Sequence, residues 1–201
     1  MKKMAFIDME GVLIPEIWPY LADCLGLEAL KVTTRDIPDY QALMKTRINC
    51  LKNNQIDFQT VRNFVDKLHP LMNANKFVQS LKDKNYEVNI VSDSFYQLLG
   101  GFFIELNIMP SSAYCHHLVI DAEGFISSVE YTRTQGKHET VNALLNRSVY
   151  SIAVGDAFND FSMLQAVSEG FLFSPSDTVK KLAPDTIQVV HQYNDILLAL
   201  N

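Results

Sequence analysis

Three short segments of the chain each place oxygen-bearing side chains directly after an apolar run with the character of a buried strand. The segments are Ile7–Val12, Val91–Ser94 and Gly155–Asp160. If these strands are neighbours in one parallel sheet, all three clusters meet at its carboxyl edge, where open α/β sheets bind their ligands. The pattern therefore predicts an α/β fold with one polar site at that edge.

Strand and helix signals alternate along most of the sequence. Strands are predicted at Met4–Asp8, Glu87–Ser92 and Tyr150–Gly155, and helices at Asn75–Lys84 and Glu139–Leu145. Such alternation is typical of α/β proteins. A hairpin is predicted with arms at His117–Ile120 and Phe125–Tyr131 and its turn at Asp121–Gly124. Two further strands that close the sheet are predicted at Gly170–Phe173 and Thr186–Val190.

One segment departs from this alternation. From Glu16 to about Met72, apolar residues repeat at helical spacing. Helix breakers divide the segment at Gly26, Pro38, Asn53-Asn54 and Pro70. We therefore expect two domains, an α/β core formed by residues 1–14 and 73–201 and an all-helical cap formed by residues 15–72.

The acidic residues of the three clusters indicate a metal site. A pocket that holds Asp8, Asp156 and Asp160 would be too negative to stand without a hard divalent cation. An oxygen-only ligand set that leaves room for a substrate phosphate is typical of Mg²⁺. The three clusters together therefore predict phosphoryl-transfer chemistry. A single Asp after a strand is more often a helix cap or a turn residue, so this prediction depends on all three clusters.

Composition narrows the class of protein. The chain has 201 residues, enough for one α/β domain with a small insertion. A formal charge of −6 with scattered Lys and Arg argues against a nucleic-acid or anionic-membrane partner. No signal peptide or membrane helix is expected, because acidic residues interrupt the first apolar run and no run approaches about 18 apolar residues. Three widely spaced cysteines favour reduced thiols in a cytoplasmic protein, namely Cys24, Cys50 and Cys115.

The polar clusters occur in an order that resembles a known family. The residues Asp8-x-Glu10-Gly11-Val12, Ser92, Lys137 and Gly155-Asp156-x-x-Asn159-Asp160 follow the motifs of the haloacid dehalogenase-like phosphatases. The stretches Asp8–Trp18, Thr33–Tyr40 and Leu43–Arg47 are similar in detail to the bifunctional phosphoserine phosphatase/homoserine phosphotransferase. This resemblance covers nearly the whole chain. It implies a Rossmann-like open parallel sheet with a small helical cap inserted after the first strand.

The resemblance also implies roles for the acidic residues. Asp8 would be the nucleophile that forms an aspartyl phosphate, and Glu10 the general acid and base. Most of the superfamily has Asp at the position of Glu10, and the extra methylene adds about 1.5 Å of reach. Mg²⁺ would bind a carboxylate oxygen of Asp8, the backbone carbonyl of Glu10 and a carboxylate oxygen of Asp156. Asp160 is expected to orient its neighbours rather than to bind the metal directly.

Four further residues are expected to hold the phosphorylated substrate. Ser92 and Lys137 would stabilise charge on the phosphoryl oxygens, Asn159 would lie near the phosphate, and Asp93 would border the substrate through its backbone amide. Three of them have an ordinary structural alternative. Asp93 could cap the next helix, Asn159 could be a turn residue, and Lys137 could be a solvated surface charge.

Substrate choice is expected to depend on the cap. By resemblance, Glu16 would receive the substrate's amino group and Arg47 its carboxylate, to which a guanidinium can donate two parallel bonds. Alternatively, Glu16 only favours a helix start and Arg47 lies on the surface. Taken together, the two residues favour an amino-acid substrate, for which we expect O-phospho-L-serine. The resemblance implies homoserine as a second phosphoryl acceptor, and the protein is expected to be a monomer or a homodimer.

Three other functions fit parts of the pattern. A phosphatase of the same superfamily could act on another small phosphorylated metabolite, in which case Glu16 and Arg47 would be incidental. A receiver-type binding module also carries a phosphorylatable Asp, but its acceptor normally lies on a middle strand and it has no cap. A nonenzymatic remnant of the family is disfavoured because no motif residue is missing.

Overall fold

The strands form one seven-stranded open sheet in the order β4-β3-β2-β1-β5-β6-β7. All neighbouring pairs are parallel except β3 and β4, which form the predicted hairpin at one edge. The computed structural model describes residues 2–34, 36–37, 39–145 and 149–200. The strands are β1 (Lys2–Ile7), β2 (Tyr86–Phe95), β3 (Ala113–Ile120), β4 (Ile126–Glu130), β5 (Val149–Gly155), β6 (Glu169–Phe173) and β7 (Ile187–Val190).

Helices cover both faces of the sheet because successive strand residues point to opposite faces. Ala5 and Ile7 of β1 belong to one hydrophobic cluster, whereas Met4 and Phe6 belong to another. The first cluster includes side chains of α4 (Ala74–Asp83), α5 (Tyr96–Glu105) and α9 (Tyr193–Ala199). The second includes side chains of α6 (His138–Leu144), α7 (Phe161–Gln165) and α8 (Asp177–Leu182). Burial on both faces explains why the central strands read as apolar runs.

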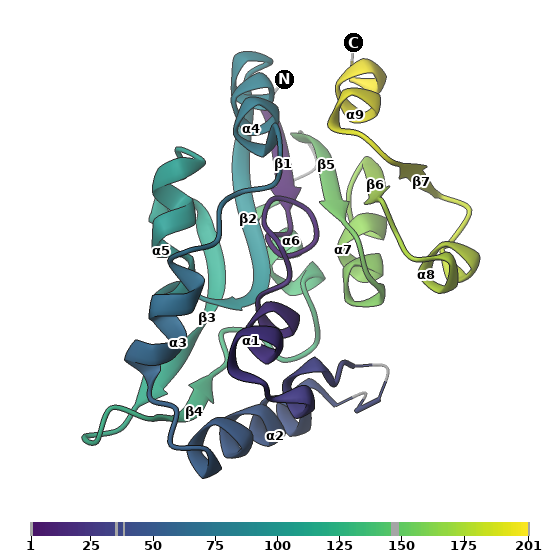
Figure 1. Cartoon of the computed structure of the whole chain (residues 1–201). Helices are drawn as coiled ribbons and strands as arrows, with labels where there is room; N and C mark the ends of the chain where they lie inside the picture. Colours follow the sequence, from purple (N-terminus) through teal and green to yellow (C-terminus); the bar gives the residue numbers. More distant parts are fainter. Residues whose placement is uncertain (1, 35, 38, 146–148, 201) are drawn as a thin grey trace.

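The segment between β1 and α4 is helical, and its described residues 16–72 contain no strand. It comprises α1 (Ile17–Leu25), a short 3₁₀ helix (Glu28–Lys31), α2 (Tyr40–Asn53) and α3 (Phe58–Val65). Figure 1 shows α1 and α2 beyond the carboxyl end of β1. Two residues of the Thr33–Tyr40 stretch, Arg35 and Pro38, lie outside the described residues.

Local capping explains where these helices begin and end. The Asp39 side chain accepts hydrogen bonds from the first turn of α2, at 2.8 and 3.2 Å. Asp57 does the same for α3, at 2.7 Å. Gly26 ends α1 in the left-handed conformation that glycine adopts without a steric penalty. The helical segment therefore follows from local sequence signals as well as from its apolar face.

The three polar clusters meet as the sequence predicts. Strands β2, β1 and β5 are adjacent and parallel, so the residues that follow them share the carboxyl edge of the sheet. The mixed α/β fold with an open, mostly parallel sheet is thereby confirmed. Among the described residues, no helix combines the length and the apolar character needed to cross a membrane.

Candidate active site

Asp8 lies at the end of β1, almost fully buried. One of its carboxylate oxygens accepts a hydrogen bond from the backbone N–H of Met9 at 2.7 Å. The other lies 2.7 Å from the ammonium nitrogen of Lys137. Its backbone N–H donates to the carbonyl of Val154 in β5 at 2.9 Å. The sheet and Lys137 therefore fix both ends of this residue.

A tight turn after Asp8 brings the chain against the third cluster. The carbonyl of Met9 accepts hydrogen bonds from the N–H groups of Leu13 and Ile14, at 2.8 and 3.0 Å. Gly11 stands in this turn with φ of +74°, and a Cβ atom there would lie 2.4 Å from Oδ2 of Asp156. Any side chain at position 11 would displace Asp156 or the turn. Glycine is therefore required both by the backbone angle and by the close approach.

The carboxylates of Asp8, Asp156 and Asp160 form one group, with an oxygen atom of each within 4.8 Å of the others. Asp160 is fully buried, and its Oδ2 accepts hydrogen bonds from the backbone N–H groups of Asp156 and Ala157, at 2.9 and 3.0 Å. Its Oδ1 accepts one from Lys137 at 2.6 Å. Both oxygens of Asp160 are therefore engaged by the protein itself.

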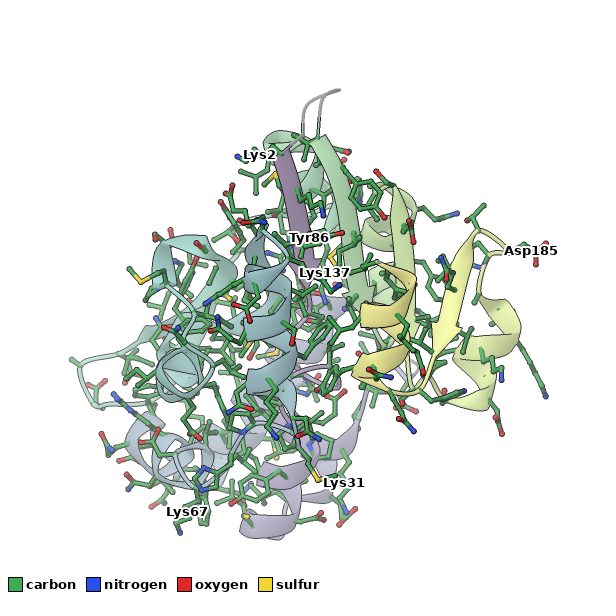
Figure 2. All side chains as sticks on the ribbon, turned by 90° about the horizontal axis from the view of Figure 1, so that it is seen from above. Lys2, Lys31, Lys67, Tyr86, Lys137 and Asp185 are labelled. Carbon is green, nitrogen blue, oxygen red and sulfur yellow. The ribbon has the colours of Figure 1, made fainter. Side chains whose placement is uncertain are left out.

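Lys137 is a buried charge and not a solvated surface residue. It lies just before α6 and is 1% exposed. Figure 2 shows it in the interior beside the central strands, whereas Lys31 and Lys67 project from the edge of the molecule. Burial disfavours its charge, but the carboxylates of Asp160 and Asp8 outweigh burial and hold its pKa above the ordinary value. Lys137 is therefore a permanent cation directed at the acidic group.

The acidic group has the chemistry of a divalent cation site. Burial, together with repulsion from Asp160, raises the pKa of Asp8 to about 8 despite the nearby Lys137. Burial and repulsion from Asp160 and Asp8 raise the pKa of Asp156 to about 9. Oxygen-only ligands suit hard cations, and a second positive charge beside Lys137 would relieve this repulsion. The residues present therefore fit such an ion.

Glu10 is anchored by the start of α1. Its Oε2 accepts a hydrogen bond from the N–H of Ile17 at 2.8 Å, one of the donors that a helix leaves unpaired at its N-terminus. Burial raises the pKa of Glu10, although the bond from Ile17 and the nearby Ser94 hydroxyl partly oppose the shift. The first cluster thus holds a buried carboxyl group at Asp8 and a half-buried one at Glu10, in different settings.

The second cluster lies where strand pairing is irregular. The register between β2 and β3 shifts between Val91 and Phe95, as in a β-bulge, which redirects local side chains. Ser92 lies within this shift, and its buried hydroxyl accepts a hydrogen bond from the N–H of Ser94 at 3.2 Å. The irregular pairing gives this segment a conformation that a regular strand would not have.

Protein groups surround the Asp93 carboxylate. Its Oδ1 lies 2.6 Å from Arg133 and 3.5 Å from Nε2 of His116, and its Oδ2 accepts a hydrogen bond from the side chain of Asn159 at 2.9 Å. Burial would raise the pKa of Asp93, but Lys137 and these partners hold it well below the usual range. Two of the expected substrate residues, Asp93 and Asn159, therefore bond to each other.

Glu16 and Arg47 lie near Glu10. Glu16 keeps access to solvent, but surrounding protein atoms and the charge of Glu10 raise its pKa to about 7. Arg47 is only 7% exposed, so it is not a surface residue. Its guanidinium donates to the carbonyl of Val32 at 2.9 Å and lies 4.7 Å from the ring centre of Trp18.

Three residues that the sequence did not predict as part of the site border it. Tyr40 donates a hydrogen bond to the backbone carbonyl of Asp93 at 2.6 Å, while Arg133 and His116 contact the carboxylate of Asp93. Tyr40 belongs to a stretch that carries the family resemblance, which is a signal that could have indicated it. A cavity of about 610 Å³ adjoins them, lined by residues that include Tyr40, Asp93, His116, Tyr131, Arg133 and Asn159.

The sequence is similar to two bacterial proteins of known name. Phosphoserine phosphatase ThrH of Pseudomonas aeruginosa is 34% identical over 194 residues, which cover 96% of this chain and 93% of that protein. A phosphoserine phosphatase of Pseudomonas syringae pv. tomato is also 34% identical, over 96% of this chain and 80% of that protein. No family model matches the sequence.

Solved structures share the fold over the whole chain. A substrate-bound phosphoserine phosphatase complex has a TM-score of 0.81 at 20% identity and covers 100% of this chain and 99% of its own. An apo phosphoserine phosphatase has a TM-score of 0.79 at 20% identity, with complete coverage of both chains. A phospho-aspartyl intermediate analogue has a TM-score of 0.77 at 21% identity, over 100% and 99%. The resemblance noted in the sequence is confirmed: the chain belongs to the phosphoserine phosphatases of the haloacid dehalogenase-like family.

Proposed function

We propose that this protein is a Mg²⁺-dependent phosphoserine phosphatase that works through an aspartyl phosphate on Asp8. The observation that carries the proposal is the contact between buried Asp8 and buried Lys137 beside Asp156 and Asp160. Such a site offers a nucleophile, a fixed cation and metal ligands together. The names of the two Pseudomonas relatives support phosphoserine as substrate.

In the first step, a carboxylate oxygen of Asp8 attacks phosphorus and the bond to the serine oxygen breaks. Glu10 gives its proton to the leaving oxygen, and its raised pKa suits a group that must hold a proton before it donates one. Glu10 then takes a proton from a water molecule that attacks the aspartyl phosphate. This step releases inorganic phosphate and restores Asp8.

Other residues stabilise the transferring group. Lys137 and the Ser92 hydroxyl would oppose the charge that develops on the equatorial phosphoryl oxygens. Bound Mg²⁺, held by Asp8, Asp156 and the carbonyl of Glu10, would supply additional positive charge to this site. Asp160 would act by orienting Lys137 and the backbone of Asp156, because both of its oxygens already accept protein hydrogen bonds.

The helices between β1 and α4 would act as the cap. We assign residues 15–72 to it and residues 1–14 and 73–201 to the core. Within the cap, Glu16 would bind the substrate's amino group and Arg47 its carboxylate. Asn159 and Asp93 would border the substrate from the core. The expected cytoplasmic location and the monomeric or homodimeric state stay predictions.

Phosphoryl transfer to homoserine extends the proposal. Once serine has left, Glu16, Arg47 and Glu10 still present partners for an amino acid with a hydroxyl side chain. Homoserine has one methylene more than serine, and Glu10 would deprotonate its hydroxyl as it deprotonates water. Positioning by two anchors gives the alcohol a high effective concentration relative to water.

The test is turnover of phosphoserine with Mg²⁺, with and without millimolar homoserine, followed by phosphorus NMR. We expect inorganic phosphate in the first mixture and O-phosphohomoserine as an added product in the second. Asp8→Asn should abolish both, whereas Asp185→Asn, a change at an exposed position, should alter neither. Equal turnover of unrelated small phosphates would favour the alternative of a phosphatase for another metabolite. If inorganic phosphate is the sole product at saturating homoserine, the proposed transferase activity is refuted.

A further inference from the structure

We propose that Arg133 is a positioning residue for the phosphoryl-transfer reaction, because it fixes the Ser92–Asp93 segment beside Asp8. This inference rests on the proposed phosphatase function. Arg133 lies outside the motifs that carry the family resemblance, in the loop after β4. It is 6% exposed, so its charge is almost completely removed from water.

The Arg133 guanidinium joins the carboxyl end of β2 to the amino-terminal end of β3. Its Nη1 donates to the carbonyl of Tyr114 in β3 at 3.0 Å. Its Nη2 donates both to the carbonyl of Ser92 and to Oδ1 of Asp93, the latter at 2.6 Å. These contacts occur where the pairing of β2 with β3 loses its register. Irregular pairing disrupts the ladder of backbone hydrogen bonds, and a buried carbonyl without a partner is costly, so Arg133 supplies the missing donors.

The Asp93 residue that Arg133 holds connects other parts of the site. Oδ2 of Asp93 accepts a hydrogen bond from Asn159, which follows β5. The backbone carbonyl of Asp93 accepts one from Tyr40, the first residue of α2. His116 of β3 lies 3.5 Å from Oδ1. Arg133 therefore supports a junction between the core and the proposed cap.

A planar guanidinium suits this task better than an ammonium does. Its two terminal nitrogens reach three oxygen atoms on two strands, whereas lysine has a single charged nitrogen. Arg133 acts through the atoms that it holds, above all the Ser92 backbone. A misplacement of about 1 Å at a reacting group can cost roughly 10²-fold in rate. Loss of these guanidinium hydrogen bonds should therefore slow the chemical step more than it weakens substrate binding.

The experiment compares Arg133→Lys and Arg133→Met with the wild-type protein and with Arg62→Met, a control at an exposed arginine. For phosphoserine with Mg²⁺ we expect kcat to fall roughly 10- to 100-fold in both Arg133 variants, with KM changed less than threefold. Rapid-quench labelling should show slower formation of the aspartyl phosphate. Arg62→Met should match the wild type in both measurements.

A second variant guards against a simple loss of folding. Asp93→Asn keeps the shape of the side chain but removes the charge that Arg133 binds, and it should lower kcat in the same way. The double variant Arg133→Lys/Asp93→Asn should lose less than the product of the single effects, because the two residues act as one unit.

Two outcomes would overturn the inference itself, and a third would overturn the function on which it rests. The first is an unchanged kcat in Arg133→Lys and in Asp93→Asn when the wild-type protein turns over phosphoserine. The second is a rise in KM at constant kcat, which would place Arg133 in substrate binding. The third is a wild-type protein inactive toward phosphoserine, which would instead remove the proposed function on which the inference rests.

Discussion

The ammonium of Lys137 lies 2.7 Å from the carboxylate of Asp8, and both side chains are almost completely buried. In the proposed reaction, the phosphoryl group must enter beside this pair, with Lys137 already directed at it. Because this cation is already in place, the site does not have to reorganise around the developing charge during the reaction, which is the advantage of a preorganised charge. The same contact also matters for folding, since each group compensates the other's burial.

We therefore predict two separate losses in Lys137→Met. Turnover of phosphoserine should fall at least about 100-fold, because a fixed charge on the phosphoryl oxygens is gone. The free energy of unfolding should fall by about 3 to 5 kcal/mol, the usual effect of removing one partner of a buried ion pair. Steady-state kinetics and chemical denaturation measure the two effects. Lys180→Met, at an exposed position, should show neither, and a fully active Lys137→Met protein would contradict the assigned role.

Removal of the metal gives a second prediction. A chelator should abolish activity, and Mg²⁺ should restore it and raise the melting temperature, because a cation relieves the repulsion among Asp8, Asp156 and Asp160. Ca²⁺ should bind but inhibit, since it takes more ligands at longer distances than the octahedral arrangement of Mg²⁺ at about 2.0 to 2.1 Å. Asp156→Asn should lose most of the Mg²⁺-induced shift in melting temperature. Full activity in chelator would refute the metal site.

Site residues can be predicted from the sequence where a polar side chain directly follows an apolar strand. Contacts between segments far apart in the sequence cannot. Asp8 and Asp156 are predictable because an acidic residue directly after a buried strand must lie at the sheet edge. The contact of Arg133 with Ser92 is not, because it depends on a local shift of strand register that leaves no repeating pattern. The sequence leaves room for a helix after Asp93, but the bounds of α5 are not predicted, because Gly100 and Gly101 lower its helical propensity although the fold buries their neighbours.

The pKa of Glu16 gives a third prediction, on pH dependence. This pKa is raised to about 7 in the folded protein by the surrounding protein atoms and by the charge of Glu10. Below pH 7 the carboxyl group is therefore mostly neutral and offers no charge to the substrate's ammonium group. KM for phosphoserine should fall as pH rises through about 7, whereas KM for an aryl phosphate, which has no amine, should not follow this change. Kinetics of Glu16→Gln provide the check, and a pH dependence of phosphoserine KM that persists in this variant would assign it to another group.

The last prediction concerns how Arg47 is held in place. Its guanidinium lies 4.7 Å from the centre of the Trp18 ring and donates to the Val32 carbonyl at 2.9 Å. A cation over an aromatic face gains about 0.5 to 2 kcal/mol, most when it is shielded from water. Trp18 is 4% exposed, so the upper part of that range applies. The ring should therefore orient the guanidinium toward the substrate's carboxylate.

We predict that Trp18→Leu lowers kcat/KM for phosphoserine by roughly 10-fold, the loss that corresponds to about 1.4 kcal/mol within the range of a shielded cation–aromatic contact. An aryl phosphate, which has no carboxylate for Arg47 to bind, should lose much less, and Trp18→Phe should recover most of the phosphoserine activity because an aromatic face remains. Phe64→Leu is the matched control, since Phe64 carries a comparable contact with Lys67 at 4.8 Å on a different helix, α3. An equal loss on both substrates in Trp18→Leu would show that the ring supports only the packing of the helices. A loss confined to phosphoserine requires that the ring act through the carboxylate partner, because the two substrates share the phosphoryl group and differ in the amino-acid portion that Arg47 is proposed to bind.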